Sequence, residues 1–251
     1  MNLNRVFINI ECEEDCILNY NYQYKLLQVL YSAYSFQNQT NAKIFHDEGF
    51  NIDNKKFKLI NTCLMFEDAN FLNEGIELKK CENVKIMLSG VEDVINEIVK
   101  GLLKMHKVII DNCNFTIEGV STDKKKINYK KTILYKVLTM VIESIYENGK
   151  IKYLSIYNNK FYNALAQNLR RKYKLIYNED FDDELFFDIE NILTVKKKKI
   201  NNIKDNGYLV GYGNFNIWIY TSVKMQKVIY YCGIGQNNTL GAGVLINLTS
   251  K

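Results

Sequence analysis

The apolar residues of this sequence change their spacing in a fixed order, and that order restricts the fold more than any other feature. Alternating apolar and polar residues predict strands, and apolar residues three or four positions apart predict helices. In the first half the expected order is strand, helix, strand, strand, helix, strand, which is the order of a ferredoxin-like unit. These expected elements cover residues 5–11, 20–36, 57–66, 77–88, 91–104 and 108–120, with a short additional helix over 42–49. The strand over 77–88 is either continuous or two pieces of a meander.

The helix expected over residues 91–104 has the clearest pattern. Its apolar stripe consists of Val91, Val94, Ile95, Ile98 and Leu102. This spacing places one apolar face against a core. Ser89 and Glu92 stand three residues apart at its start, which predicts a capping box.

The second half repeats the same order more loosely. Strands are expected over 127–141, 192–200 and 208–220, helices over 158–174 and 221–232, and a last strand over 244–248. The helix over 158–174 has an apolar stripe of Phe161, Leu165 and Leu169, which we expect to face inward. The polar stretch 121–128 is the best boundary between the halves. We therefore expect an α+β protein with two tandem ferredoxin-like domains, residues 1–122 and 123–251.

Composition narrows the classes of function. The net charge of +5 is compatible with a polyanionic partner. Six cysteines without a CxxC pair and only two histidines do not match the pattern of a zinc site, so we expect none. Scattered unpaired thiols suit a reducing cytosol. The sequence has no apolar run of membrane-spanning length, so we expect a soluble cytoplasmic protein that does not bind a membrane.

The sequence ends with a glycine-rich stretch, Gly233-Ile-Gly-Gln-Asn-Asn-Thr-Leu-Gly-Ala-Gly243, before a short apolar segment. Glycine is required where the backbone takes positive φ or lies close to a ligand. Consecutive exposed N–H groups in such a loop form a site for an anion. Ala242 follows Gly241 where a Walker loop has lysine, and a strand follows where a dinucleotide fingerprint needs a helix. A glycine-rich hairpin without a ligand is the alternative.

Three residue types in the first half are candidates for acid–base chemistry. His46 lies in an irregular polar stretch. At neutral pH an imidazole can both accept and donate protons. Lys55, Lys56 or Lys58 follows closely and could stabilise extra charge on a phosphate. Tyr31 lies on the first expected helix, where it is either a core residue or an active-site phenol. His106 lies at a turn before a strand, and we interpret it as structural.

Two basic clusters lie in the second half. Lys196 and Lys198 share one face of an expected strand, because side chains alternate along a strand. They belong either to a solvated strand or to a groove that holds phosphates. The second cluster lies near the C-terminal end of a helix, where the helix dipole or RNA would explain it; its members are Arg170, Arg171, Lys172 and Lys174.

Together, these stretches resemble the CRISPR-associated endoribonucleases of the RAMP type, which cleave the repeats of precursor CRISPR RNA. The resemblance rests on three segments: residues 20–33, residues 45–59 and the glycine-rich stretch 233–243. Their order and spacing are similar to the family over nearly the whole chain. The segment 51–56 lengthens the gap between His46 and Lys58 relative to the family.

The resemblance implies two ferredoxin-like domains and cleavage that needs neither a metal nor a cofactor. It implies catalytic roles for His46, Tyr31 and Lys58. The 2′-hydroxyl of the RNA would attack the adjacent phosphorus and leave 5′-hydroxyl and 2′,3′-cyclic phosphate ends, or a 3′-phosphate after opening. The expected RNA-binding residues are Gly233, Gly235, Gln236, Asn237, Asn238, Gly241, Gly243, Lys196, Lys198, Arg170 and Arg171.

The expected partner is CRISPR repeat RNA, and the protein would act as a monomer or homodimer. Other subunits of a CRISPR interference complex are further candidate partners. Two alternatives remain open: a non-catalytic subunit that binds the repeat RNA, and an unrelated ferredoxin-like interaction protein.

Overall fold

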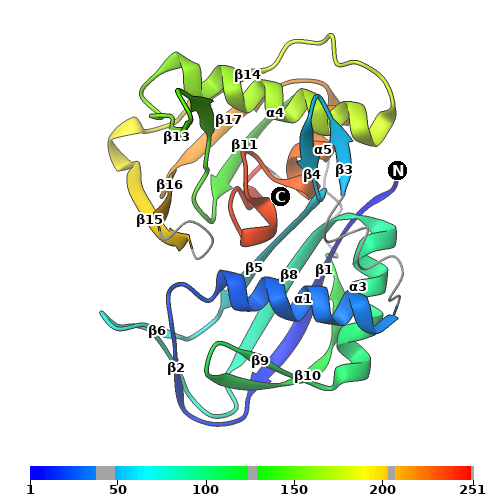
Figure 1. The fold of residues 1–251 in the computed structure, drawn as a ribbon, viewed down its shortest axis with the longest axis vertical. Helices are drawn as coiled ribbons and strands as arrows, with labels where there is room; N and C mark the ends of the chain where they lie inside the picture. Colours follow the sequence, from blue (N-terminus) through cyan, green and yellow to red (C-terminus); the bar gives the residue numbers. More distant parts are fainter. Residues whose placement is uncertain (38–48, 124–128, 203–206, 250–251) are drawn as a thin grey trace. The chain divides into compact units, whose positions relative to one another are not determined.

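The structure is a computed structural model that describes residues 1–37, 49–123, 129–202 and 207–249. The chain divides into two compact units, Asn2–Asp123 and Lys124–Lys251 together with Met1. The expected boundary lies one residue before this division. Each unit contains an antiparallel sheet and α-helices, so the α+β class is confirmed (Figure 1). Among the described residues, no helix combines the length and apolarity that crossing a membrane requires.

The N-terminal unit is built on a five-stranded antiparallel sheet in the order β5-β8-β1-β10-β9. Its strands are β1 (Leu3–Cys12), β5 (Ile60–Phe66), β8 (Asn83–Val91), β9 (Lys107–Ile110) and β10 (Cys113–Thr122). Alternate residues of β1 are buried, among them Ile8 and Ile10. Without the edge strand β9, the order places the first strand between the third and the fourth, as in a ferredoxin-like unit.

Two helices pack together across this sheet, α1 (Gln23–Gln37) and α3 (Glu92–Met105) (Figure 1). The predicted stripe of α3 is confirmed, because Ile95, Ile98 and Leu102 are fully buried. Gly101 allows the two helices to approach, since a Cβ atom there would collide with the backbone of Ala33. Glycine in a helix interior costs about 1 kcal/mol relative to alanine, and this close contact offsets that cost.

Shorter strands flank the main sheet of the N-terminal unit. One group forms a three-stranded sheet in the order β2-β7-β6, and another forms the hairpin β3–β4. The strands are β2 (Cys16–Leu18), β3 (Phe50–Ile52), β4 (Lys55–Phe57), β6 (Asn70–Phe71) and β7 (Ile76–Leu78).

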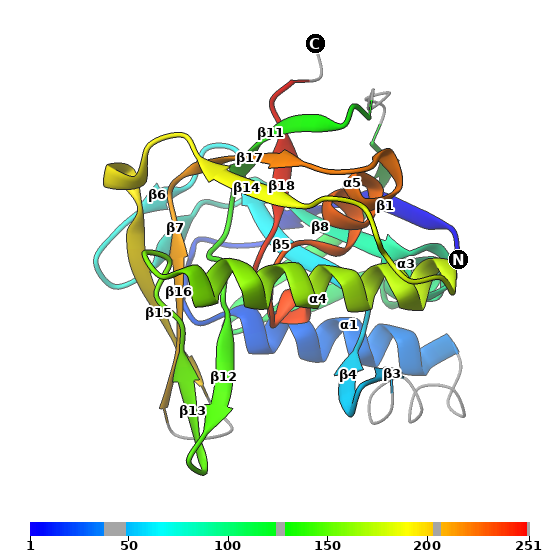
Figure 2. The same cartoon turned by 90° about the horizontal axis from the view of Figure 1, so that it is seen from above.

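The C-terminal unit has a four-stranded antiparallel sheet in the order β14-β17-β11-β18. Its strands are β11 (Thr132–Val137), β14 (Phe186–Ile189), β17 (Asn216–Tyr220) and β18 (Leu245–Asn247). The helices α4 (Asn159–Tyr177) and α5 (Val223–Cys232) complete the unit (Figure 2). The first strand again lies between the third and the fourth, so both units follow one connectivity.

Two hairpins extend from the C-terminal unit (Figure 2). They are β12 (Ser144–Glu147) with β13 (Lys150–Tyr153), and β15 (Lys196–Asn202) with β16 (Gly207–Gly213). A short 3₁₀ turn, Ile192–Thr194, precedes β15. Val141 connects β16 to the segment after β11 through two backbone hydrogen bonds with Tyr212, of 2.7 and 2.9 Å.

Three predicted strands were wrong in their continuity. The runs 57–66, 108–120 and 208–220 are each broken by a residue with positive φ: Leu59, Asp111 and Asn214 respectively. Asn and Asp enter this left-handed region more readily than other non-glycine residues. The apolar pattern hid the breaks because it continues on both sides of each turn. The strand predicted over 192–200 was also misplaced, since the sheet uses β14 and leaves β15 to a hairpin.

The predicted capping box was wrong as well. Ser89 is fully buried inside β8, and α3 starts after Val91 without a side-chain cap. Glu92 and Asp93 instead place negative charge in the first turn, where the helix dipole favours it. Of the short helix predicted over 42–49, residues 42–48 lie outside the described residues.

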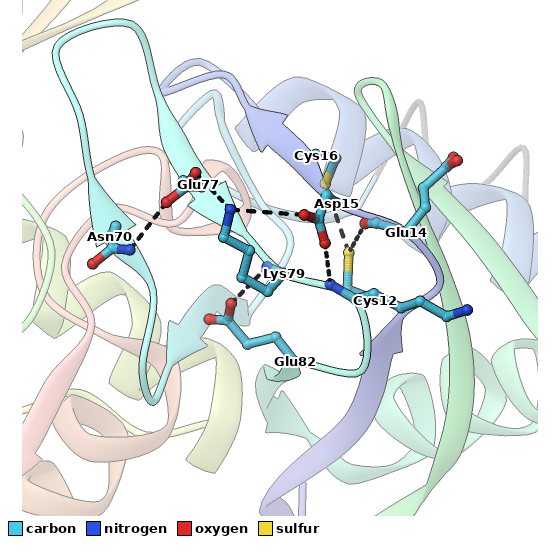
Figure 3. A network of polar contacts seen from close by, with 9 residues as sticks. Cys12, Glu14, Asp15, Cys16, Asn70, Glu77, Lys79 and Glu82 are labelled. Carbon is cyan, nitrogen blue, oxygen red and sulfur yellow. Dashed lines mark hydrogen bonds and ion pairs between the residues drawn. The ribbon is translucent and has the colours of Figure 1, made fainter.

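Two of the cysteines expected to be unpaired form a disulfide, which corrects that prediction. Cys16 at the start of β2 is bonded to Cys113 at the start of β10, with 5.8 Å between their Cα atoms. Cys12 lies beside the bond: its Sγ is 3.6 Å from the Sγ of Cys16 and 3.0 Å from the carbonyl oxygen of Glu14 (Figure 3). The residues that pair lie 97 positions apart, so local spacing could not reveal them.

Polar contacts hold the turn that precedes β8 next to the same segment (Figure 3). The ammonium of Lys79 is 2.8 Å from a carboxylate oxygen of Glu77 and 3.7 Å from one of Asp15. The backbone N–H of Lys80 donates to Asp15 at 2.8 Å. Exposed ion pairs of this kind contribute little to stability individually. The disulfide therefore constrains this segment more strongly than the ion pairs do.

Candidate active site and glycine-rich loop

The candidate catalytic residues belong to the N-terminal unit, and the structure describes two of the three. His46 lies outside the described residues. Tyr31 is half-buried on α1, next to the fully buried Leu30. Burial raises the pKa of the Tyr31 phenol. This group therefore stays protonated at neutral pH and can donate a hydrogen bond or a proton.

The hairpin β3–β4 brings Lys58 next to Gly49, although residues 50–57 separate the two in the sequence. Phe50 pairs with Phe57, so residues 51–56 fold out as the hairpin. The Lys58 side chain then lies against Gly49: a Cβ atom at Gly49 would be 3.1 Å from Lys58 Cδ and 3.4 Å from its Nζ. Gly49 is three residues after His46 in the sequence.

The other two candidate lysines differ from Lys58 in their surroundings. Lys55 and Lys56 lie on β4, exposed to solvent. Lys58 is partly buried after the end of that strand. A partly buried ammonium interacts more strongly with a phosphate than an exposed one, because the effective dielectric constant is lower. The geometry therefore favours Lys58.

The glycine-rich loop joins α5 to β18 and requires its glycines. Gly233, Gly235, Gly241 and Gly243 have φ values of 70°, 71°, 77° and 72°. Side chains rarely tolerate this region. At Gly243 a Cβ atom would also collide with the carbonyl oxygen of Ile234. The expectation that these positions need positive φ is confirmed.

Most backbone N–H groups of the loop donate hydrogen bonds within the loop or to the neighbouring segment after β11. Ile234 donates to Gly243, and Gln236 and Gly243 donate to the segment after β11, to Ile142 at 2.8 Å and Met140 at 2.9 Å. The loop then makes a 3₁₀ turn over Asn238–Leu240 after Asn237 in left-handed conformation.

At the 3₁₀ turn, three successive backbone N–H groups are available to a ligand. Within the described ranges, the N–H groups of Asn237, Asn238 and Thr239 donate to no protein acceptor. A left-handed residue followed by helical residues, with consecutive N–H groups available, forms a concavity that suits an anion.

Two side chains that were expected to contact RNA make hydrogen bonds within the C-terminal unit. Gln236 donates to a carboxylate oxygen of Glu143 at 3.1 Å and to the carbonyl oxygen of Ser144 at 3.0 Å. Asn238 donates to the carbonyl oxygens of Ile234 at 3.1 Å and Ala242 at 2.9 Å. Both amides therefore support the conformation of the loop.

One lysine of the basic cluster at the end of α4 lies beneath the loop. Lys172 on α4 is buried, and its ammonium donates to the carbonyl oxygens of Gly233 and Gly235 at 2.9 and 3.1 Å. The available signal was its position on the buried stripe of α4, which also contains Leu165, Leu169 and Ile176.

The remaining basic residues lie on two elements of the C-terminal unit. Arg170 is exposed and Arg171 half-buried on α4. Lys196 and Lys198 are exposed on β15. Lys198 lines a cavity of about 470 Å³ together with Lys136, Asn214, Phe215 and Asn216. The sequence analysis did not identify Lys136.

Two family models and a curated relative match this chain over nearly its whole length. The family model "CRISPR-associated protein Cas6, N-terminal" matches residues 17–121, and "CRISPR associated protein Cas6, C-terminal" matches residues 122–246. A CRISPR-associated endoribonuclease Cas6 of Methanocaldococcus jannaschii is 28% identical over 251 residues, covering 98% of this chain and 94% of that protein.

Solved structures show the same fold. A CRISPR-associated protein Cas6 superposes with a TM-score of 0.78 at 25% identity, covering 98% of this chain and 100% of the other. A Cas6-related protein from Pyrococcus furiosus superposes with a TM-score of 0.82 at 17% identity, covering 100% of both chains.

Proposed function

Because this chain belongs to the Cas6 family of CRISPR-associated endoribonucleases, which process precursor CRISPR RNA, we propose that it cleaves the CRISPR repeat by attack of a 2′-hydroxyl, without a metal ion. The observation that carries the proposal is the turn of the glycine-rich loop, with the N–H groups of Asn237, Asn238 and Thr239 available for a phosphate. Such a site suits a polyanion.

In the proposed reaction the RNA supplies its own nucleophile. The 2′-oxygen bonds to the adjacent phosphorus, and the bond from phosphorus to the 5′-oxygen breaks. A base takes the proton of the 2′-hydroxyl, and an acid gives a proton to the leaving 5′-oxygen. The products are a 2′,3′-cyclic phosphate, which water can open to a 3′-phosphate, and a 5′-hydroxyl.

We assign His46, Tyr31 and Lys58 to these steps. His46 acts as general base or acid. Tyr31, whose pKa is raised by burial, acts as a hydrogen-bond or proton donor. Lys58, beside Gly49, stabilises the additional negative charge of the pentacovalent phosphate.

We assign RNA binding to the C-terminal part of the chain. The proposal divides the protein into two tandem ferredoxin-like domains: residues 1–122 carry the catalytic residues, and residues 123–251 bind the repeat. The strand order of each sheet supports this division. The loop glycines 233, 235, 241 and 243 shape the phosphate site, with Arg170, Arg171, Lys196 and Lys198 as further contacts.

Cleavage of a repeat RNA in EDTA tests the reaction, alongside the same RNA with one 2′-deoxy nucleotide at the cut site. We expect one product boundary that survives EDTA and disappears with the deoxy substitution, because the nucleophile is then absent. Cleavage that stops in EDTA, or that continues on the deoxy RNA, would contradict the mechanism. Tight binding without any product would indicate the non-catalytic subunit instead.

The contribution of β15 is testable through the salt dependence of binding. Lys196→Ala/Lys198→Ala should weaken RNA binding and flatten the plot of log K against log salt by roughly 1.4, since each lost phosphate contact on single-stranded RNA lowers the slope by about 0.7. The matched control is Lys197→Ala/Lys199→Ala, which removes the same charge from the opposite face of the strand. Equal slopes for the two double variants would contradict the assignment to one face.

A further inference from the structure

Lys172 is a buried cation that lies beneath the glycine-rich loop and donates hydrogen bonds to it. Its side chain projects from α4 and is 2% exposed. The ammonium donates to Asn238 Oδ1 at 2.7 Å and to the carbonyl oxygens of Gly233, Gly235 and Cys232 at 2.9, 3.1 and 3.3 Å. An ammonium has three donors, so four acceptors use its capacity fully.

All four acceptors belong to one continuous stretch, which runs from the end of α5 into the 3₁₀ turn. Lys172 therefore holds the two glycines that begin the loop and the side chain of Asn238 at the same point. Asn238 in turn donates to Ile234 and Ala242. Through this residue the ammonium connects the two glycine pairs of the loop, which lie on either side of the turn.

Two titratable groups face the ammonium. Glu143, after β11, is 1% exposed and contacts the loop through Gln236 at 3.1 Å, and its negative charge favours the charged lysine. The thiol of Cys232, at the end of α5, has its pKa raised to about 12 by burial and stays neutral at physiological pH. Against these contacts, burial lowers the pKa of Lys172 to about 8.

We propose that Lys172 is a positioning residue for RNA: its ammonium holds the turn in the conformation that leaves the N–H groups of Asn237, Asn238 and Thr239 available to a phosphate. This inference rests on the proposed function, because it assumes that the loop binds repeat RNA. The charge also contributes directly, since a buried cation acts on a nearby phosphate through a low dielectric constant.

The proposal has a consequence for pH. A neutral amine has two donors and a lone pair, so it cannot satisfy four oxygens. A bound phosphate favours the protonated lysine, and RNA must therefore bind more tightly at the pH where Lys172 is charged. Affinity should fall as pH rises through about 8, the pKa of the buried lysine.

Stability should change in the opposite direction. The pKa of Lys172 is lower in the folded protein than in the unfolded chain, so between the two values the unfolded state binds more protons. Its contribution to the free energy of unfolding therefore rises with pH above about 8. If the protein lost its fold as pH rises, RNA affinity and stability would fall together. A fall in affinity while stability rises therefore indicates a positioning role for Lys172.

The experiment measures the Kd of wild type and Lys172→Met for a 2′-deoxy repeat RNA between about pH 7 and 9. We expect the variant to bind roughly 10- to 100-fold more weakly at pH 7, without the pH dependence of the wild type. The matched control is Lys174→Met, which removes one positive charge from the same helix. Lys174 is exposed and paired with Asp180 at 2.7 Å, so its removal should change Kd little.

A second variant keeps the proposal testable if Lys172→Met does not fold. Glu143→Gln retains a side chain that can bond Gln236 and removes the negative charge that favours charged Lys172. Its affinity should decline at a lower pH than that of the wild type. Wild-type binding that is independent of pH, or a Lys172→Met profile identical to wild type, would overturn the inference. Absence of wild-type binding to the repeat would instead overturn the proposed function.

Discussion

Replacing His46 with alanine is expected to lower the rate of repeat-RNA cleavage by roughly 10²–10⁴-fold, the usual contribution of a general acid or base. RNA affinity should change little, because the proposed binding residues lie in the C-terminal half of the chain. Single-turnover cleavage with excess enzyme measures the chemical step, and binding to 2′-deoxy RNA measures affinity separately.

The second histidine of the sequence provides a matched control. His106 ends α3 with φ of 58°, and its carbonyl oxygen accepts from the N–H of Ile117 at 2.8 Å. Asn tolerates positive φ better than most residues, so His106→Asn should cleave at the wild-type rate. Normal cleavage by His46→Ala would end the assignment of His46, and an equal loss in both variants would show that the effect is not specific to His46.

Breaking the disulfide between Cys16 and Cys113 is expected to lower the free energy of unfolding by about 4 kcal/mol. The bond closes a loop across 97 positions, and its loss enlarges the conformational entropy of the unfolded chain. Denaturant titration with and without a reducing agent measures the difference. Superimposable transitions would contradict the prediction.

The preferred variant for this test is Cys16→Ser. In Cys113→Ser, Cys12 could replace the missing partner, because its Sγ lies 3.6 Å from that of Cys16. Cys81→Ser is the control, since Cys81 is an exposed free cysteine. The reducing agent should lower the stability of Cys81→Ser as it does for wild type, and should have no effect on Cys16→Ser.

Local pattern was sufficient for the helices with a continuous apolar stripe. The stripes of α3 and α4 are buried where the spacing predicts, because helical periodicity is a property of neighbouring residues. It was insufficient where one residue reverses the chain. Leu59 carries no turn signal, yet its φ of 50° separates β4 from β5. Ser89 resembled a helix cap and is a buried strand residue, because the sheet extends further than the motif suggests.

Some features of the candidate site were also predictable from local sequence, and others were not. The glycine spacing indicated a loop with positive φ, and the structure has positive φ at all four glycines. The roles of Gln236 and Asn238 were not predictable, because their amides bond to groups such as Glu143 and Lys172 that are distant in sequence. Lys172 itself was grouped with the basic cluster at the end of its helix, although its position on the α4 stripe placed it inside.

By itself, the sequence determined the α+β class, the stripes of the long helices, the need for glycine in the loop and the resemblance to the family, because each depends on residues that are close in the chain. Only the tertiary structure decided that Cys16 joins Cys113, that the β3–β4 hairpin brings Lys58 against Gly49, and that Lys172 lies beneath the loop. These contacts join distant residues, and packing selects them among many partners that local preference leaves equivalent.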